Sequence, residues 1–132
     1  MKHLLLATLV MLAACAHAEL PPTYYMERQA QAPDYYAIEV VSVQTDSLDA
    51  EHMQVDVVAR VDTIYRCSSA RAVGDMIHIR YVHEHYKRPV MGPSPIPLLQ
   101  EGQQCPAWLE PDPRELCFIP AARGFSFREM RM

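Results

Sequence analysis

The segment from Met53 to Tyr65 constrains the fold most, because apolar and polar side chains alternate along its length. A period of two predicts a β-strand with one face in a core and the other toward solvent. A strand of this length has to bend, as the strands of a small barrel do. The face that we expect to be buried consists of Met53, Val55, Val57, Ala59, Val61, Thr63 and Tyr65.

Two further segments, 36–43 and 76–86, carry strand patterns. In the first, the apolar face changes between Val40 and Val41, which predicts either a β-bulge or a strand covered on both faces. The second is apolar on one face and polar on the other, so we expect a half-buried strand. Its predicted buried side chains are Ile77, Ile79 and Tyr81.

The C-terminal part of the chain predicts a loop and two short strands. Four prolines between residues 89 and 97 exclude a central strand, so we expect 88–100 to be a loop. Segments 104–109 and 115–120 are the two short strands, joined by a proline-rich turn at 110–114. Five strands favour an all-β fold in which barrel closure removes the exposed strand edges.

Composition narrows the class of protein. The 132 residues are 50% hydrophobic and carry a net charge of −4, which fits one folded domain and opposes nucleic-acid binding. There is no G-x-S-x-G motif, and the four glycines form no phosphate-binding loop. These observations predict a protein that is not an enzyme.

Residues 1–18 have the features of a secretory signal: Lys2, an apolar run and a small-residue end. Cleavage after the sequence Ala16-His17-Ala18 would remove this segment. The sequence Leu12-Ala13-Ala14-Cys15 also resembles the lipobox of bacterial lipoproteins, which implies removal of residues 1–14 and lipidation of Cys15. Either route predicts the periplasm or the outer membrane, with the membrane contacted only through the lipid.

The remaining chain divides into three parts. We expect 19–34 to be a tether or a loosely packed arm, because it contains prolines, glutamines and alanines without a sustained period. The alternative to a solvated spacer is that Tyr24, Tyr25 and Met26 dock on the domain. The barrel is predicted for 35–127, with Phe125 and Phe127 closing its core, and 128–132 is a C-terminal tail.

Several short phrases resemble the netrin-like modules. They are Val58-x-x-Val61-x-x-x-Tyr65-Arg66, Gly74-Asp75-x-Ile77-x-Ile79-x-Tyr81 and Leu98-Leu99-x-Glu101-Gly102. The resemblance covers 35–127 and implies a five-stranded OB-like barrel that makes protein–protein contacts. It also suggests, by fold analogy, a protease-inhibitor-like module. The family's inhibitors use the free amino group of an N-terminal Cys, and neither predicted start of the mature chain provides one.

His83 and His85 are candidate metal ligands. On a strand they project to the same side, about 7 Å apart, and can hold zinc or copper if a third ligand approaches. Further donors on the chain are His52, Met53, His78, Met130 and Met132. The alternative is a solvated strand end with no cofactor.

Three cysteines remain after the signal, which allows one disulfide. We expect Cys105 and Cys117 to pair across the proline-rich turn, with Cys67 a free thiol or an intermolecular link. Pairing of Cys67 with either of the other two is the alternative, because strand ends meet in barrels.

The 88–100 loop is apolar and restricted by its prolines. It either presents Met91, Ile96 and Leu98 to a partner or packs across one end of the barrel. Together these features predict a non-enzymatic binding or accessory protein of the cell envelope. Its partner would be an envelope protein or an extracellular polymer, and the alternative function is zinc or copper binding in the periplasm.

Overall fold

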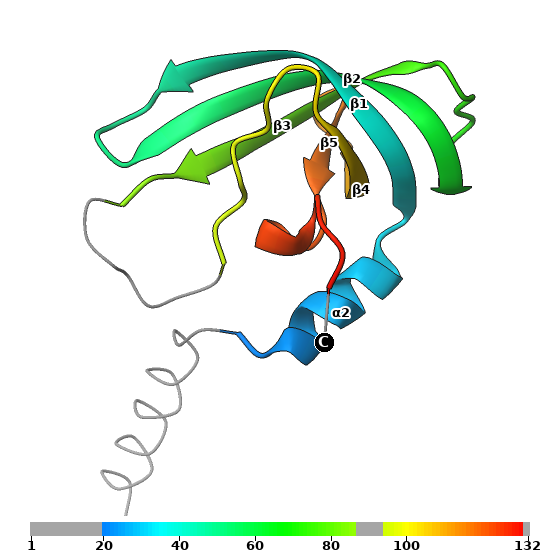
Figure 1. Cartoon of the computed structure of the whole chain (residues 1–132), viewed down its shortest axis with the longest axis horizontal. Helices are drawn as coiled ribbons and strands as arrows, with labels where there is room; N and C mark the ends of the chain where they lie inside the picture. Colours follow the sequence, from blue (N-terminus) through cyan, green and yellow to red (C-terminus); the bar gives the residue numbers. More distant parts are fainter. Residues whose placement is uncertain (1–19, 87–93, 131–132) are drawn as a thin grey trace, which may run out of the picture.

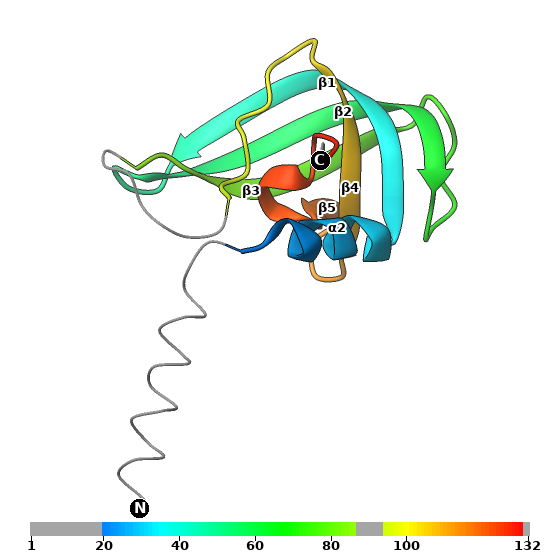
Figure 2. The ribbon, with the colours of Figure 1, turned by 60° about the horizontal axis from the view of Figure 1, so that its bottom comes forward.

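The computed structural model describes residues 20–86 and 94–130. These residues form a closed five-stranded barrel with one helix beside it (Figures 1 and 2). In chain order the elements are helix α2 (Pro22–Gln31), strands β1 (Asp34–Ser47), β2 (His52–Arg66), β3 (Met76–Glu84), β4 (Gln104–Asp112) and β5 (Cys117–Pro120), and the 3-10 turn η1 (Arg123–Phe125). The predicted signal, Cys15 and Met91 lie outside the described residues.

The strand order around the barrel is β1-β2-β3-β5-β4, and β4 returns to pair with β1. The pairing of β3 with β5 is parallel, at Ile79 and Phe118, whereas the other pairs are antiparallel. The pairing of β1 with β4 closes the barrel, so that each strand has a partner on both sides. This arrangement confirms the predicted all-β, OB-like barrel, while its assignment to the netrin type stays a prediction.

The predicted inward faces of β2 and β3 lie in the barrel core, to which β1, β4 and β5 also contribute. Fully or almost fully buried side chains include Val55, Val57, Ala59, Val61, Ile77, Ile79 and Tyr81, and Phe127 joins the same cluster. Two members of the predicted β2 face are exceptions, since Thr63 and Tyr65 are exposed. The alternation therefore identifies the core face correctly up to Val61 and fails beyond it.

Bulges explain where the alternation breaks. On β1 the register shifts between Val40 and Ser42, which confirms the predicted bulge. A second shift pairs Ala37 with Thr63 but Ile38 with Val61, which leaves Asp62 as the extra residue. The inward face of β2 therefore moves by one residue, and Ile64 packs against the core.

The predicted tether is wrong, because most of it is helix α2. Pro22 occupies the first turn, where a missing N–H costs nothing, and the helix lies beside η1 (Figure 2). Tyr25 is buried against Phe125, with ring centroids 4.7 Å apart, and its hydroxyl accepts a 2.8 Å hydrogen bond from the amide of Ser94. Tertiary contacts thus stabilise a ten-residue helix that is too short to be stable alone.

The last hairpin is also shifted relative to the prediction. Strand β4 continues to Asp112, through Pro111 of the predicted turn at 110–114, and the connection is 113–116, which contains Pro113. Pro106 and Pro111 both lie within β4. Segment 94–103, by contrast, forms no strand, as its prolines predicted.

Candidate functional site

A depression of about 310 Å³ lies where β2 begins and β3 ends. Its lining residues are Ser47, Asp49, Ala50, Glu51, His52, Met53, His83, His85 and Leu98, and most of them carry side chains that can ligate a metal. Antiparallel pairing of β2 with β3 places them together, because His52 is opposite Glu84 and Met53 is opposite His83. His83 and His85, predicted as ligands from their spacing, therefore share this depression with a third histidine.

Hydrogen bonds fix the imidazole rings of His83 and His52, in each case through the ring's own Nδ1 atom. Nδ1 of His83 lies 2.7 Å from the carbonyl oxygen of Ile96, and Nδ1 of His52 lies 2.9 Å from Oδ1 of Asp49. Carbonyl and carboxylate oxygens only accept, so Nδ1 carries the proton in both rings and Nε2 keeps the lone pair of the neutral form. Metal-binding histidines show this arrangement, in which the second ring nitrogen is fixed by an acceptor.

The turn between β1 and β2 builds the acidic side of the depression. Amides of Glu51 and His52 donate to Oδ1 of Asp49, at 2.8 and 2.9 Å. The Glu51 amide and the His52 ring lower the pKa of Asp49, and the Asp49 carboxylate in turn raises the pKa of His52. The His85 amide donates to the Glu51 carbonyl at 2.7 Å, which ties the end of β3 to this turn.

The 94–100 segment closes the inner side of the depression. Ile96 is partly buried against the barrel core, so this part of the loop packs across the barrel end. The Tyr81 hydroxyl donates to the Pro97 carbonyl at 2.8 Å and accepts from the Leu99 amide at 3.2 Å. Leu98 is 39% exposed at the rim, which leaves it accessible to a ligand or partner.

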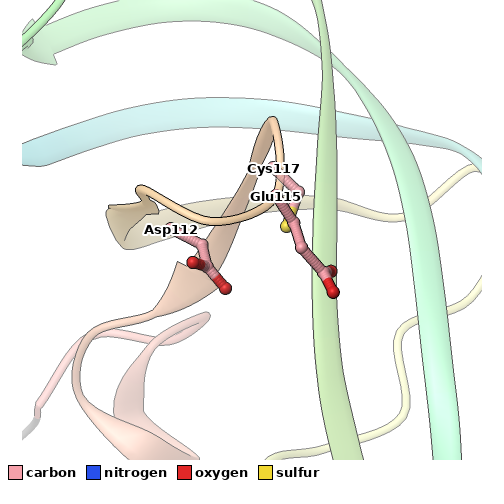
Figure 3. Close-up of side chains that lie close together, drawn as sticks. All are labelled: Asp112, Glu115 and Cys117. Carbon is pink, nitrogen blue, oxygen red and sulfur yellow. The ribbon is translucent and has the colours of Figure 1, made fainter.

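A second group of metal-ligating side chains consists of Asp112, Glu115 and Cys117, at the connection between β4 and β5 (Figure 3). In the part of the chain that the structure describes, this is the one group of three whose ligand atoms all lie within 4.8 Å of one another. Burial and the two neighbouring carboxylates raise the pKa of Cys117, which disfavours the thiolate that a metal would need.

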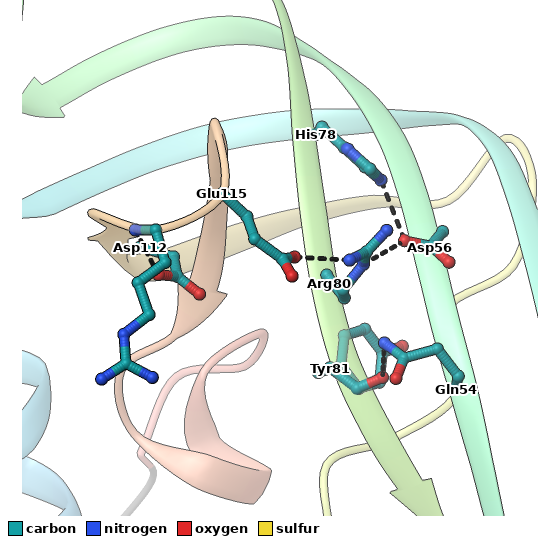
Figure 4. Close-up of polar contacts among 8 residues, drawn as sticks. Gln54, Asp56, His78, Arg80, Tyr81, Asp112 and Glu115 are labelled. Atoms are coloured by element: carbon teal, nitrogen blue, oxygen red, sulfur yellow. Dashed lines mark hydrogen bonds and ion pairs between the residues drawn. The ribbon is translucent and has the colours of Figure 1, made fainter. Parts of the chain in front are cut away.

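Glu115 of this group is already paired with Arg80 (Figure 4). Arg80 also donates to Asp56 at 2.7 Å, and His78 Nε2 lies 3.1 Å from the same carboxylate oxygen. The hydrogen bond from Arg80 lowers the pKa of Asp56. His78, Arg80 and Glu115 line a hollow of about 330 Å³, in which the charge of Glu115 is already balanced by Arg80. Its arginine repels a cation, so the histidine depression is the better candidate metal site.

The predicted disulfide between Cys105 and Cys117 is not formed. The described cysteines, Cys67, Cys105 and Cys117, are all free thiols. Because the hairpin turns at 113–116, the residue opposite Cys117 is Asp112, whereas Cys105 pairs with Ile38 at the other end of β4. Asp112 lies seven positions after Cys105 on β4, about 23 Å away at the rise of a β-strand, which is far beyond the reach of a disulfide.

The sheet also carries a stack of three aromatic rings. The Tyr35 ring is parallel to Trp108, with centroids 4.5 Å apart and planes 11° apart, and it also lies 4.5 Å from Tyr65. Arg66 places its guanidinium 5.9 Å from the centre of the Tyr35 ring. Tyr65 is 58% exposed, so the stack ends at the surface.

Sequence reasoning named His52 and Met53 as possible donors but did not place them beside His83. The available signal was the hairpin formed by 53–65 and 76–86, because two antiparallel strands bring the start of one to the end of the other. No sequence pattern predicted that Asp49 and the Ile96 carbonyl would accept hydrogen bonds from the histidine rings, because the conformations of a turn and a loop place them there.

Comparisons with family models, with curated proteins and with solved structures each found no match. Within residues 20–86 and 94–130, no helix is long and apolar enough to cross a membrane.

Proposed function

We propose that this protein is a non-enzymatic binding protein of the cell envelope whose ligand is a late transition-metal ion, zinc or copper. The observation that carries the proposal is the shared depression of His52, His83 and His85, with two rings fixed through Nδ1. Imidazole nitrogen is a preferred ligand of both metals, and three such ligands suffice for an open site. The secretory features of residues 1–18 support an envelope location.

The site as it stands is preorganised only in part. His83 is held at the strand end, half-buried, whereas His85 is exposed and follows the last residue of β3. The ring nitrogens of His52, His83 and His85 do not all lie within 4.8 Å of one another, so a bound metal would require their side chains to rearrange. Asp49 and Glu51 add negative charge at the rim, which favours a dication.

Titration of the purified apo-protein with Zn²⁺ and Cu²⁺ tests the proposal. We expect micromolar or tighter binding of one ion per chain, and at least a tenfold loss of affinity in His83→Ala and in His52→Ala. His78→Ala is the matched control, because His78 lies in the Asp56 network outside the depression, and its affinity should equal that of the unchanged protein. Millimolar affinity, or full affinity in His83→Ala, overturns the proposal.

The aromatic stack supports a second candidate, binding of an extracellular polymer made of sugar rings. Exposed, rigid aromatic rings offer a flat apolar face at low entropic cost, and Tyr65 is backed by Tyr35 and Trp108. Retention on insoluble envelope polysaccharide should fall in Tyr65→Ala and not in Leu116→Ala, which removes an even more exposed apolar side chain elsewhere. Equal retention of both variants overturns this candidate.

A further inference from the structure

We infer that the histidine depression also binds copper in its reduced form, with the thioether of Met53 as a ligand to Cu(I). The inference rests on the proposed metal-binding function and adds a choice of metal to it. It follows from the position of Met53, whose thioether lies beside the imidazole ligands in the depression.

Met53 is the direct cross-strand neighbour of His83 in the pairing of β2 with β3. Opposed residues on one sheet face have Cβ atoms about 4.5–5.5 Å apart, so the Met53 thioether and the His83 imidazole can reach a common ion. Met53 lines the same depression as His52 and His83. It is partly buried and packs against the barrel core, which restricts the volume in which its sulfur can move.

The chemistry of this donor separates the metals. A thioether is a soft, uncharged ligand that favours Cu(I), whereas zinc and Cu(II) are served by imidazole and carboxylate. The depression has both kinds of donor, with soft Met53 on the inner side and Asp49 and Glu51 in the turn at its edge. We therefore expect Met53 to contribute to Cu(I) binding and to be dispensable for Zn²⁺.

The alternative role of Met53 is to fill space, as methionine does in many irregular cores. Met53→Leu separates the two roles, because leucine keeps the volume and apolar character and removes only the sulfur. Met76→Leu is the matched control: Met76 is 49% exposed at the opposite end of the β2–β3 pair, where Arg60 is its neighbour.

The experiment uses the purified protein with its methionine methyl groups labelled with carbon-13, under anaerobic conditions with Cu(I) as the probe. Met53→Leu and Met76→Leu assign the two signals by their loss. We expect Cu(I) to shift the Met53 methyl resonance and leave that of Met76 in place, and Met53→Leu to bind one Cu(I) fewer per chain. Because the methyl signal reports on one site, copper bound at the free thiols does not obscure it.

A parallel Zn²⁺ titration of the same variants distinguishes a missing Met53–Cu(I) contact from a missing metal site. Unchanged zinc affinity in Met53→Leu, together with its lost Cu(I) equivalent, supports the inference. A Met53 methyl signal that stays unshifted at Cu(I) saturation overturns the inference while the zinc site stands. If the unchanged protein binds neither ion at the histidines, the proposed function fails and the inference fails with it.

Discussion

The Tyr36 hydroxyl donates a 2.8 Å hydrogen bond to Oδ1 of Asp34, two residues earlier on β1, and both residues are fully buried. Ser68 completes the carboxylate's coordination through its amide at 3.0 Å and its hydroxyl at 2.8 Å. A buried carboxylate is tolerated only when its acceptor sites are used. This network fixes the loop that follows β2 onto the first residues of β1.

Replacing Asp34 should therefore destabilise the barrel strongly. Asp34→Ala leaves the Tyr36 hydroxyl and the Ser68 amide without their acceptor, and we expect the free energy of unfolding to fall by about 3 kcal/mol. Tyr36→Phe removes one of three donors and should cost about 1 kcal/mol. Urea denaturation measures both values. Asp46→Asn, at an exposed position, is the control and should change stability by less than about 0.5 kcal/mol.

Helix α2 should depend on Tyr25 for its attachment. Tyr25→Ala removes the ring that packs on Phe125, and we expect a loss of about 3 kcal/mol together with faster proteolysis within Pro22–Gln31. Tyr25→Phe keeps the ring and loses only the hydrogen bond from Ser94, at a cost of about 1 kcal/mol. Met26→Ala, at an exposed position on the same helix, controls for helix propensity. Unchanged proteolysis in Tyr25→Ala would show that the helix is held by other contacts.

The three thiols should differ in reactivity. Burial raises the pKa of Cys67, but hydrogen bonding with the Tyr36 side chain and with the backbone of Ser69 and Arg71 more than compensates, and the net effect lowers the pKa. Burial raises the pKa of Cys105 and of Cys117. Because the thiolate is the nucleophile, limited iodoacetamide at pH 8 should label Cys67 first.

Peptide mass spectrometry of the protein, labelled in its native, non-reduced state, identifies which cysteines carry the iodoacetamide label. We expect single labelling at Cys67 and, after unfolding without reductant, labelling of all three cysteines. A peptide pair linked through Cys105 and Cys117 would contradict the free thiols and the register of the last hairpin.

Stability should decline at alkaline pH partly through Cys105, whose pKa burial raises to about 11. The unfolded chain releases this proton near pH 8.5, so between there and about pH 11 the unfolded state binds fewer protons and the free energy of unfolding falls. Below pH 8.5 the contribution is fully present. Cys105→Ala should flatten the decline between pH 8.5 and 10, measured by urea midpoints. Parallel curves for the two proteins would show that Cys105 is not the group responsible.

The sequence was informative wherever a local pattern matched a local structure. Alternation identified the inward faces of β2 up to Val61 and of β3, and the change of apolar face after Val40 located a bulge. Spacing also placed His83 and His85 on the side of the strand that reaches the depression. These features depend on the two-residue period of the strand backbone, which is written directly in the order of side chains.

Tertiary contacts decided the rest. Pro22–Gln31 is a helix because Tyr25, Arg28 and Gln29 find partners near η1 that lie more than 90 residues away in sequence. The shift of the last turn to 113–116 separated Cys105 from Cys117, since β4 gains its pairing from β1 despite its prolines.

By itself the sequence determined an all-β barrel and the identity of the metal-ligating side chains, because period and residue type are local properties. Only the tertiary structure decided that His52, Met53 and His83 share one depression and that acceptors fix two of the rings. Register between strands and hydrogen bonds from loops depend on residues far apart in the chain, and no local pattern specifies them.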